Sequence, residues 1–325
     1  MTWIALALGL LVATVALSYL VEAARRPPVA PAVVPWAPEI PVRYLDVNGV
    51  RLRYLVAGEG PPLVLLHTLR TQLEMFQHLV PALATRFRVY ALDHPGHGYS
   101  DIPEADYSAD FFVRTLAAAL DRLEIEDALV VGESIGGSIA LVLAARGHPR
   151  VGRVVAVNPY DYAGGRGLRR SSPLANVIFG LNDVPLLGAT VTRLRLYPIV
   201  RQVFRGGVRR PGALPESLAR EMYLVGNRPG HARAFTSLVR HWGSWEAARA
   251  EYRHIQRPVL LVYGEHDWSR EEERAAEARD VPGAETVVIR GAGHFLSLDA
   301  SGELASAILD WAGTPEPPVP ARATG

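Results

Sequence analysis

A serine in a glycine-flanked turn is the first residue whose setting suggests chemistry. Residues 132–136 read Gly-Glu-Ser-Ile-Gly, which is the pattern G-x-S-x-G. The stretch ends a short apolar run at 128–132 and precedes a helical pattern near 137–146. A strand–turn–helix of this kind holds a hydroxyl above the end of a sheet and aims the first amides of the helix at the same point. The pattern predicts Ser134 as a nucleophile.

A serine hydroxyl needs a base to remove its proton, and one histidine is well placed for this role. His294 lies in a loop after the last predicted strand, and Asp267 follows the strand before it. The carboxyl ends of parallel strands meet at one edge of a sheet, where open α/β sheets bind ligands. We therefore expect His294 to activate Ser134 and Asp267 to orient the imidazole. Asp161, which follows the sixth predicted strand, is the alternative acid.

The composition excludes several other chemistries. The chain has no cysteine, and all 34 of its basic residues are arginine. Thiolate nucleophiles, cysteine metal sites, Schiff-base lysines and phosphate-loop lysines are therefore absent. A formal net charge of +1 gives no reason to expect a nucleic-acid partner. We predict no metal ion and no organic cofactor.

Strand-like and helical stretches alternate along the body of the chain. Runs such as residues 63–66 and 154–157 are apolar on both faces, as central strands of a helix-covered parallel sheet are. Asn48–Gly49 between two strand-like runs predicts a hairpin. The pattern predicts an α/β fold with a mostly parallel eight-stranded sheet and helices on both faces. Strands are expected at 43–47, 50–57, 63–67, 88–92, 128–132, 153–157, 258–263 and 286–289, and helices near 72–84, 110–123, 137–146, 269–279 and 300–311.

The alternation stops near residue 160 and resumes after residue 250. One domain that carries an insertion explains this interruption. We expect core segments at 41–159 and 251–312 and a helical cap at 160–250. The cap has many more arginines than carboxylates. Three explanations of this excess of arginine stay open: solubility together with coding bias, contact with anionic lipid, and recognition of an anionic substrate.

The two ends of the chain differ from its body. Residues 3–21 form an uncharged apolar run long enough to cross a bilayer, and Arg25–Arg26 follows it. This basic pair favours a single-pass anchor with the catalytic body in the cytoplasm, whereas a cleaved signal peptide with export is the alternative. The predicted segments are a transmembrane anchor at 1–24, a proline-rich linker at 25–40 that adds little to the core, and a disordered tail at 313–325.

Together these motifs resemble the α/β-hydrolase superfamily, in its serine-nucleophile branch with a cap inserted after the sixth strand. The resemblance covers about residues 41 to 312. Residues 93–101 read Asp-His-Pro-Gly-His-Gly-Tyr-Ser-Asp, which is similar to the structural D-x-P-G-x-G-x-S motif of that family. The resemblance implies that the backbone N–H groups of Ile135 and Leu69 form the oxyanion hole.

One stretch departs from the family pattern. Residues 67–70 read His-Thr-Leu-Arg, where most members of the family have His-Gly. The threonine narrows the allowed backbone conformations. Arg70 could bind a substrate carboxylate or phosphate, and the alternatives are a solvated loop arginine or one paired with Glu74 or Glu133. His67 and Glu133 are further candidates for substrate binding.

The expected activity is hydrolysis of a small carboxylic ester, with a lipid-derived ester as one candidate, through an acyl-enzyme. Carbon–carbon bond hydrolysis, thioester hydrolysis, perhydrolysis and acyl transfer use the same triad and stay open. A serine at the elbow argues against dehalogenase and epoxide hydrolase chemistry. The departure at Thr68 leaves a rival from another class, a membrane-tethered binding protein without activity.

Overall fold

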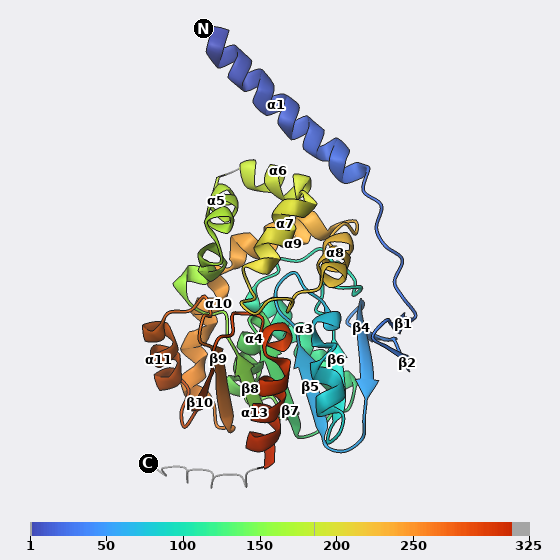
Figure 1. Ribbon diagram of the computed structural model, residues 1–325, viewed down its shortest axis with the longest axis vertical. Helices are drawn as coiled ribbons and strands as arrows, with labels where there is room; N and C mark the ends of the chain where they lie inside the picture. The colour runs from blue at the N-terminus through green and yellow to red at the C-terminus, as the bar shows by residue number, and fades with distance from the viewer. Residues whose placement is uncertain (1, 185, 314–325) are drawn as a thin grey trace.

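An eight-stranded sheet forms the centre of the computed structural model, which describes residues 2–184 and 186–313 (Figure 1). Its strand order is β10-β9-β8-β7-β5-β6-β4-β3. β4 runs antiparallel to β3 and β6, and all other neighbours are parallel. The predicted mostly parallel sheet is confirmed. The strands are β3 (Arg43–Val47), β4 (Val50–Ala57), β5 (Pro62–Leu66), β6 (Arg88–Leu92), β7 (Ala128–Glu133), β8 (Val151–Val157), β9 (Val259–Gly264) and β10 (Glu285–Ile289).

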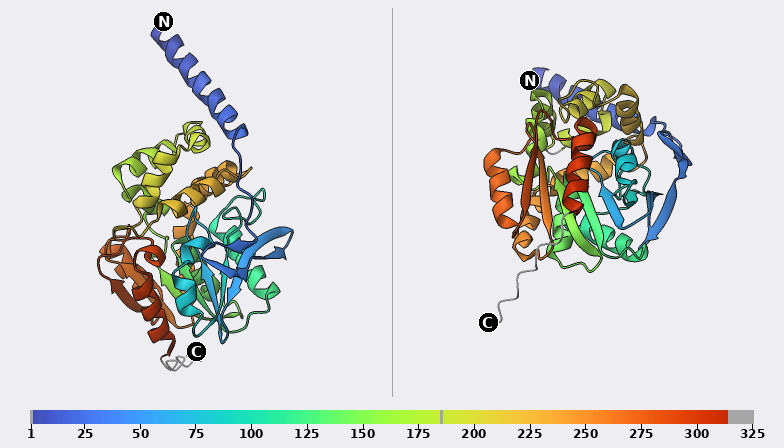
Figure 2. Two further views of the ribbon diagram at one scale, coloured as in Figure 1. Left: turned by 45° about the vertical axis from the view of Figure 1, so that its right-hand side comes forward. Right: turned by 60° about the horizontal axis from the view of Figure 1, so that its bottom comes forward.

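Helices cover both faces of this sheet (Figure 2). α2 (Leu79–Leu83) and α13 (Ser301–Gly313) pack together on one face, and α3 (Ala109–Arg122) and α4 (Ile135–Ala145) pack together on the other. Every residue of β7 and β9 is buried, which explains why these strands are apolar up to Glu133 at the end of β7. The remaining elements of the core are η1 (Leu73–Phe76), α11 (Glu271–Asp280) and α12 (Leu296–Asp299).

The β3–β4 hairpin follows from its two turn residues. Asn48 and Gly49 both have positive φ, 53° and 78°, as a type I′ turn requires. The N–H of Gly49 also donates to Asp46 Oδ1 at 3.1 Å. Local chemistry alone therefore fixes this register, and the hairpin forms at the predicted residues.

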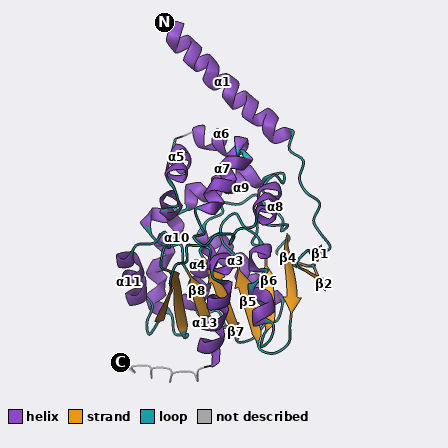
Figure 3. Cartoon of the chain, viewed as in Figure 1, coloured by secondary structure: helices purple, strands orange, loops and turns teal. Residues whose placement is uncertain are grey.

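Between β8 and β9 the chain forms a helical segment, called the insertion below, above the carboxyl ends of the parallel strands (Figure 3). The structure assigns no strand there in the ranges 160–184 and 186–250. α5 begins at Pro173 because Ser172 caps it by accepting a hydrogen bond from the N–H of Ala175. The inserted elements are η2 (Ala163–Gly165), η3 (Gly167–Arg170), α5 (Pro173–Leu181), α6 (Leu187–Leu194), α7 (Tyr197–Arg205), α8 (Glu216–Val225), α9 (His231–His241), α10 (Gly243–Ala248) and η4 (Arg249–His254).

The N-terminal helix α1 (Thr2–Ala23) extends away from the body (Figure 1). It is long and apolar enough to cross a membrane, a property that it shares with signal sequences. Its last turns contact the insertion. Glu22 pairs with Arg195 at 2.6 Å, and the guanidinium of Arg25 donates to Asn227 Oδ1 and to the backbone oxygen of Leu194, each at 2.9 Å. The base of the helix is therefore fixed against the inserted helices.

The proline-rich segment after α1 is more ordered than the sequence predicted. β1 (Val33–Val34) and β2 (Ala37–Pro41) form a separate two-stranded antiparallel sheet. Val34 is fully buried and Ala37 is 4% exposed, so these two residues of the predicted linker at 25–40 belong to the hydrophobic core. The apolar residues between the prolines explain the difference, because their burial favours order. In the predicted tail, residues 314–325 lie outside the described residues.

Candidate active site

Ser134 occupies a strained turn between β7 and α4. Its φ is 59° and its ψ is −119°, a conformation that L-residues rarely adopt. A Cβ atom on Gly132 would lie 2.0 Å from the backbone oxygen of Gly136, and a Cβ on Gly136 would lie 2.2 Å from the backbone oxygen of Leu66. Only glycine fits at both positions, which gives the G-x-S-x-G pattern its physical cause. The turn holds the hydroxyl of Ser134 at the carboxyl edge of the sheet.

His294 brings its ring to this hydroxyl from the loop after β10. Its Nε2 lies 2.9 Å from Ser134 Oγ, and its Nδ1 is hydrogen-bonded to Asp267 Oδ1. The side chains of His294 and Asp267 are both fully buried. When Nδ1–H donates to the carboxylate, Nε2 is free to accept the proton of the serine. The three side chains thus form the hydrogen-bonded series Ser134–His294–Asp267.

Asp267 is held in its ionised form by its neighbours. Its Oδ2 accepts hydrogen bonds from the N–H of Ser269 at 2.9 Å and from the Ser269 hydroxyl. Burial by itself would raise the pKa of Asp267, but the charge of His294 and these hydrogen bonds lower that pKa below its usual value. An ionised carboxylate stabilises the imidazolium that forms when the serine loses its proton.

Asp161, the alternative acid, lies in a different environment. Its carboxylate accepts a hydrogen bond from the hydroxyl of Tyr252 at 2.7 Å and lies 3.9 Å from a guanidinium nitrogen of Arg249. Burial raises the pKa of this carboxyl. The structure therefore brings Asp267 to His294 and leaves Asp161 within a buried network.

The two residues predicted to supply amide donors lie near Ser134, one next to it in the sequence and one in the wall of the same chamber. Ile135 is the first residue of α4, so its N–H has no partner within the helix. Leu69 and Thr68 line a chamber of about 30 Å³ that also contains Ser134. Positive φ in this loop occurs at Arg70 (59°) and not at Thr68. A threonine is therefore tolerated where the family has glycine.

His67 and Glu133, predicted as further substrate contacts, are held inside the protein instead. His67 Nε2 accepts the N–H of His94 at 2.9 Å, so its Nδ1 donates to the backbone oxygen of Thr68 at 2.7 Å. Glu133 Oε2 accepts a hydrogen bond from the hydroxyl of Ser297 at 2.5 Å. Burial raises the pKa of Glu133 to about 7, although this hydrogen bond by itself lowers that pKa. Both residues shape the loops around the site, and neither reaches the chamber.

The Asp-x-Pro-Gly motif has a structural role. Asp93 accepts the backbone N–H groups of Leu73 and Tyr99 at 2.8 and 2.9 Å and pairs with Arg53 at 3.2 Å. A Cβ on Gly98 would lie 2.0 Å from the carboxylate of Asp93, so this close approach requires glycine. The motif fixes the loop after β6 against η1. Within residues 2–184 and 186–313, no group of three or more His, Asp or Glu side chains could hold a metal ion.

Two residues that position the site were missed from the sequence. Asn158 follows β8 and donates to the backbone oxygens of His294 at 2.8 Å and Gly293 at 3.2 Å, while its Oδ1 accepts the N–H of Gly264 at 2.9 Å. The indole of Trp268 stacks on the ring of His294, with centroids 3.7 Å apart and planes 12° apart. Asn158 therefore links the loop that carries His294 to the end of β9, and Trp268 packs against the imidazole ring of His294. Their places after β8 and beside Asp267 were the only available signals.

Known proteins are similar to this chain in sequence and in fold. The family described as alpha/beta hydrolase fold matches residues 61–301. A 2-hydroxymuconate semialdehyde hydrolase of a Pseudomonas species is 28% identical over 288 residues, covering 85% of this chain and 94% of that protein. A haloalkane dehalogenase of Mycolicibacterium paratuberculosis is 28% identical over 293 residues, covering 82% of this chain and 91% of that protein. The crystal structure of an enol-lactonase from Burkholderia xenovorans, 24% identical, superposes with a TM-score of 0.67 and covers 84% of this chain and 100% of its own. The chain belongs to the α/β-hydrolase fold family.

Proposed function

We propose that the protein is a serine hydrolase that cleaves a carboxylic ester through an acyl-enzyme. The hydrogen-bonded series Ser134–His294–Asp267 carries this proposal. His294 takes the proton as Ser134 Oγ attacks the ester carbonyl, and it returns that proton to the departing alcohol. Water, deprotonated by the same imidazole, then attacks the acyl group and releases the acid. The N–H groups of Ile135 and Leu69 stabilise the oxyanion in both steps.

The walls of the chamber favour an apolar substituent on the ester. The chamber is lined by aromatic and aliphatic side chains that include Leu168, Phe204, Trp268 and Phe295. Leu168 and Phe204 come from the insertion between β8 and β9, and we propose that this insertion acts as a cap. Burying the reacting groups beneath it strengthens their electrostatic interactions and keeps bulk water out.

A second candidate, hydrolysis of a carbon–carbon bond, is favoured by one observation. The relative that the chain matches along 94% of its length is a 2-hydroxymuconate semialdehyde hydrolase. Thioester hydrolysis, perhydrolysis and acyl transfer could use the same three residues.

Substrate assays with the purified full-length protein separate these candidates. We expect turnover of 4-nitrophenyl acetate, butyrate and octanoate, and no turnover of 2-hydroxymuconate semialdehyde. Release of 4-nitrophenolate measures the first activity, and loss of the chromophore of the semialdehyde measures the second. Cleavage of the semialdehyde alone would establish the second candidate, and inertness toward every substrate would favour a binding protein.

We further propose that α1 anchors the protein in a membrane, with the hydrolase body in the cytoplasm. The exposed apolar surface of α1 and the basic pair Arg25–Arg26 after it support this proposal. Contacts of Glu22 and Arg25 with the insertion would hold the cap close to the lipid surface. A lipid-derived ester is compatible with that placement.

Deleting residues 2–31 should move the protein from the membrane fraction to the soluble fraction and preserve ester turnover. The deletion removes the apolar helix but retains β1, β2 and the buried Val34. Fractionation by ultracentrifugation, followed by an ester assay, measures both effects. A matched deletion of residues 2–41 should be less stable by about 2 kcal/mol or more, because it also removes buried apolar surface at Val34. If expression of the complete sequence gave a soluble protein whose N-terminus had been cleaved, α1 would be a signal peptide.

A further inference from the structure

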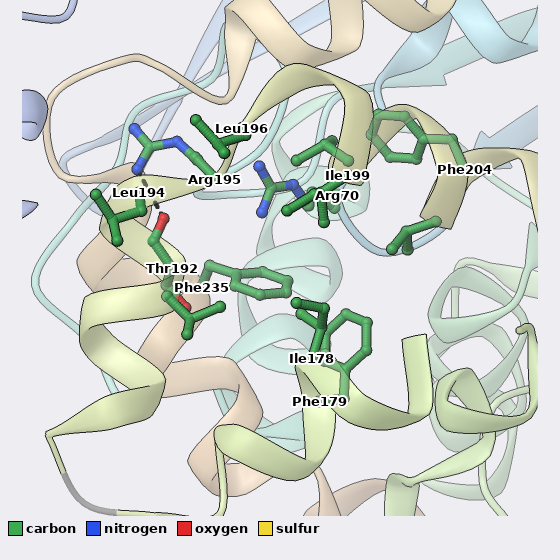
Figure 4. A pocket seen from close by; sticks show the side chains of 13 residues that line it. Arg70, Ile178, Phe179, Thr192, Leu194, Arg195, Leu196, Ile199, Phe204 and Phe235 are labelled. Atoms are coloured by element: carbon green, nitrogen blue, oxygen red, sulfur yellow. Dashed lines mark hydrogen bonds between the residues drawn. The ribbon is translucent and has the colours of Figure 1, made fainter. Parts of the chain in front are cut away.

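An apolar cavity of about 200 Å³ lies among the inserted helices (Figure 4). Ile178, Leu196 and Ile199 contribute to its walls. Phe179, Val203, Phe204, Phe235 and Arg70 line both this cavity and the small chamber that contains Ser134. A molecule whose ester group reaches Ser134 therefore has the larger cavity as its neighbouring space.

Two arginines line this largely apolar cavity. Arg70 comes from the loop after β5, and Arg195, which is 5% exposed, directly follows α6. In Figure 4 the guanidinium group of Arg70 lies among the lining side chains, and that of Arg195 lies at their edge beside Leu194. The Nε and Nη2 atoms of each are buried and, among the described residues, have no hydrogen-bond partner. Buried cationic donors that lack partners are strongly unfavourable, so this arrangement calls for an anion.

Within residues 2–184 and 186–313, no carboxylate forms an ion pair with Arg70. Glu74 is bound by Arg53 at 2.6 Å, and Glu133 by Ser297, so neither pairs with Arg70 as one prediction allowed. The guanidinium of Arg70 instead lies 4.9 Å from the centroid of the Phe235 ring. Burial lowers the pKa of Arg70 to about 9, and the positive charges of Arg195 and Arg25 add to this effect.

Arg195 is only partly neutralised. Its Nη1 pairs with Glu22 of α1 at 2.6 Å, but Glu22 also pairs with Arg25 at 3.1 Å. Positive charge therefore remains in surplus at this end of the cavity. The free Nε and Nη2 atoms of Arg70 and Arg195 form the side-on forks with which guanidinium groups bind carboxylates. A carboxylate offers about four lone-pair sites to these four nitrogen atoms.

We propose that Arg70 and Arg195 form a subsite for a carboxylate of the substrate. The enzyme would then act on small esters that carry a free carboxylate beyond an apolar chain. This inference rests on the ester hydrolysis proposed above and specifies its substrate class. The apolar walls hold the chain, the arginine pair holds the anionic end, and the ester carbonyl lies at Ser134.

Two chromogenic esters of equal chain length test the subsite. 4-Nitrophenyl hydrogen adipate carries a free carboxylate, and 4-nitrophenyl methyl adipate is its neutral counterpart. We expect the full-length wild-type protein to favour the anionic ester by about 10-fold or more in kcat/KM, mainly through KM. Arg70→Gln and Arg195→Gln should each lower this preference by about 10-fold or more. The matched control is Arg220→Gln on an exposed part of α8, which should keep the wild-type preference.

Binding to the Ser134→Ala variant gives a readout that does not depend on turnover. Calorimetry should show tighter binding of the anionic ester, and Arg70→Gln in that background should abolish the difference. Equal binding of the two esters would overturn the subsite, while turnover of both by the wild type would still support the hydrolase. Tighter binding of the anionic ester without turnover of either ester by the wild type would support the subsite and contradict the proposed hydrolase activity. Stronger competition by hexyl phosphate than by heptanoate would overturn the choice of a carboxylate.

Discussion

Replacing Ser134 by alanine is expected to reduce ester turnover by about 10⁴- to 10⁶-fold while the protein stays folded. The substitution removes only the hydroxyl whose Oγ lies 2.9 Å from His294 Nε2. His294→Ala should lose about as much activity, because the serine then has no base. The double variant should be no worse than either single variant, since nucleophile and base act as one unit. Initial rates with 4-nitrophenyl butyrate and circular dichroism measure activity and fold.

A buried serine one turn along α4 provides the matched control for this experiment. Ser138 is 1% exposed, like Ser134, and its hydroxyl accepts the N–H of Tyr160 at 2.9 Å. Ser138→Ala should cost stability of about 1 kcal/mol and retain most of the turnover. Full activity in Ser134→Ala, or loss of activity confined to Ser138→Ala, would reject Ser134 as the nucleophile.

The second large effect is expected from Asp267→Asn, which should lower kcat by about 10⁴-fold with little change in KM. An amide is nearly the same shape as the carboxylate, but it removes the negative charge and favours the wrong imidazole tautomer. Asp161→Asn should have a mild effect on kcat, because Asp161 is bound by Tyr252 and does not contact His294. Steady-state kinetics of both variants on the same ester make the comparison. A larger loss of kcat in Asp161→Asn than in Asp267→Asn would identify Asp161 as the acid.

Local chemistry explains which parts of the fold could be predicted. Asn48–Gly49 determines a type I′ turn, and apolar runs such as β5 and β7 need burial on both faces, so the sheet was predictable without tertiary information. The turn around Ser134 was predictable for a similar reason, since only glycine fits at positions 132 and 136. His294 and Asp267 followed from a topological rule, because both come after strands that end at the same edge.

The missed features depend on contacts between distant parts of the chain. Asn158 acts through the backbone of His294, and Trp268 acts by stacking on its ring; neither interaction leaves a periodic pattern in the sequence. Arg70 and Arg195 line the same cavity although they are far apart in the sequence, and Glu22 of α1 pairs with Arg195. Val34 was assigned to a linker because proline-rich composition predicts extended chain, but burial of its side chain outweighs that preference.

Labelling with a fluorophosphonate probe, followed by peptide mapping, tests the central claim most directly. Only a serine activated by a neighbouring base reacts rapidly with such a probe, because its oxygen must attack phosphorus as a nucleophile. The wild-type protein should gain one adduct, located at Ser134, and labelling should slow strongly in His294→Ala. No adduct in the folded wild-type protein, or an adduct at another serine, would contradict the account.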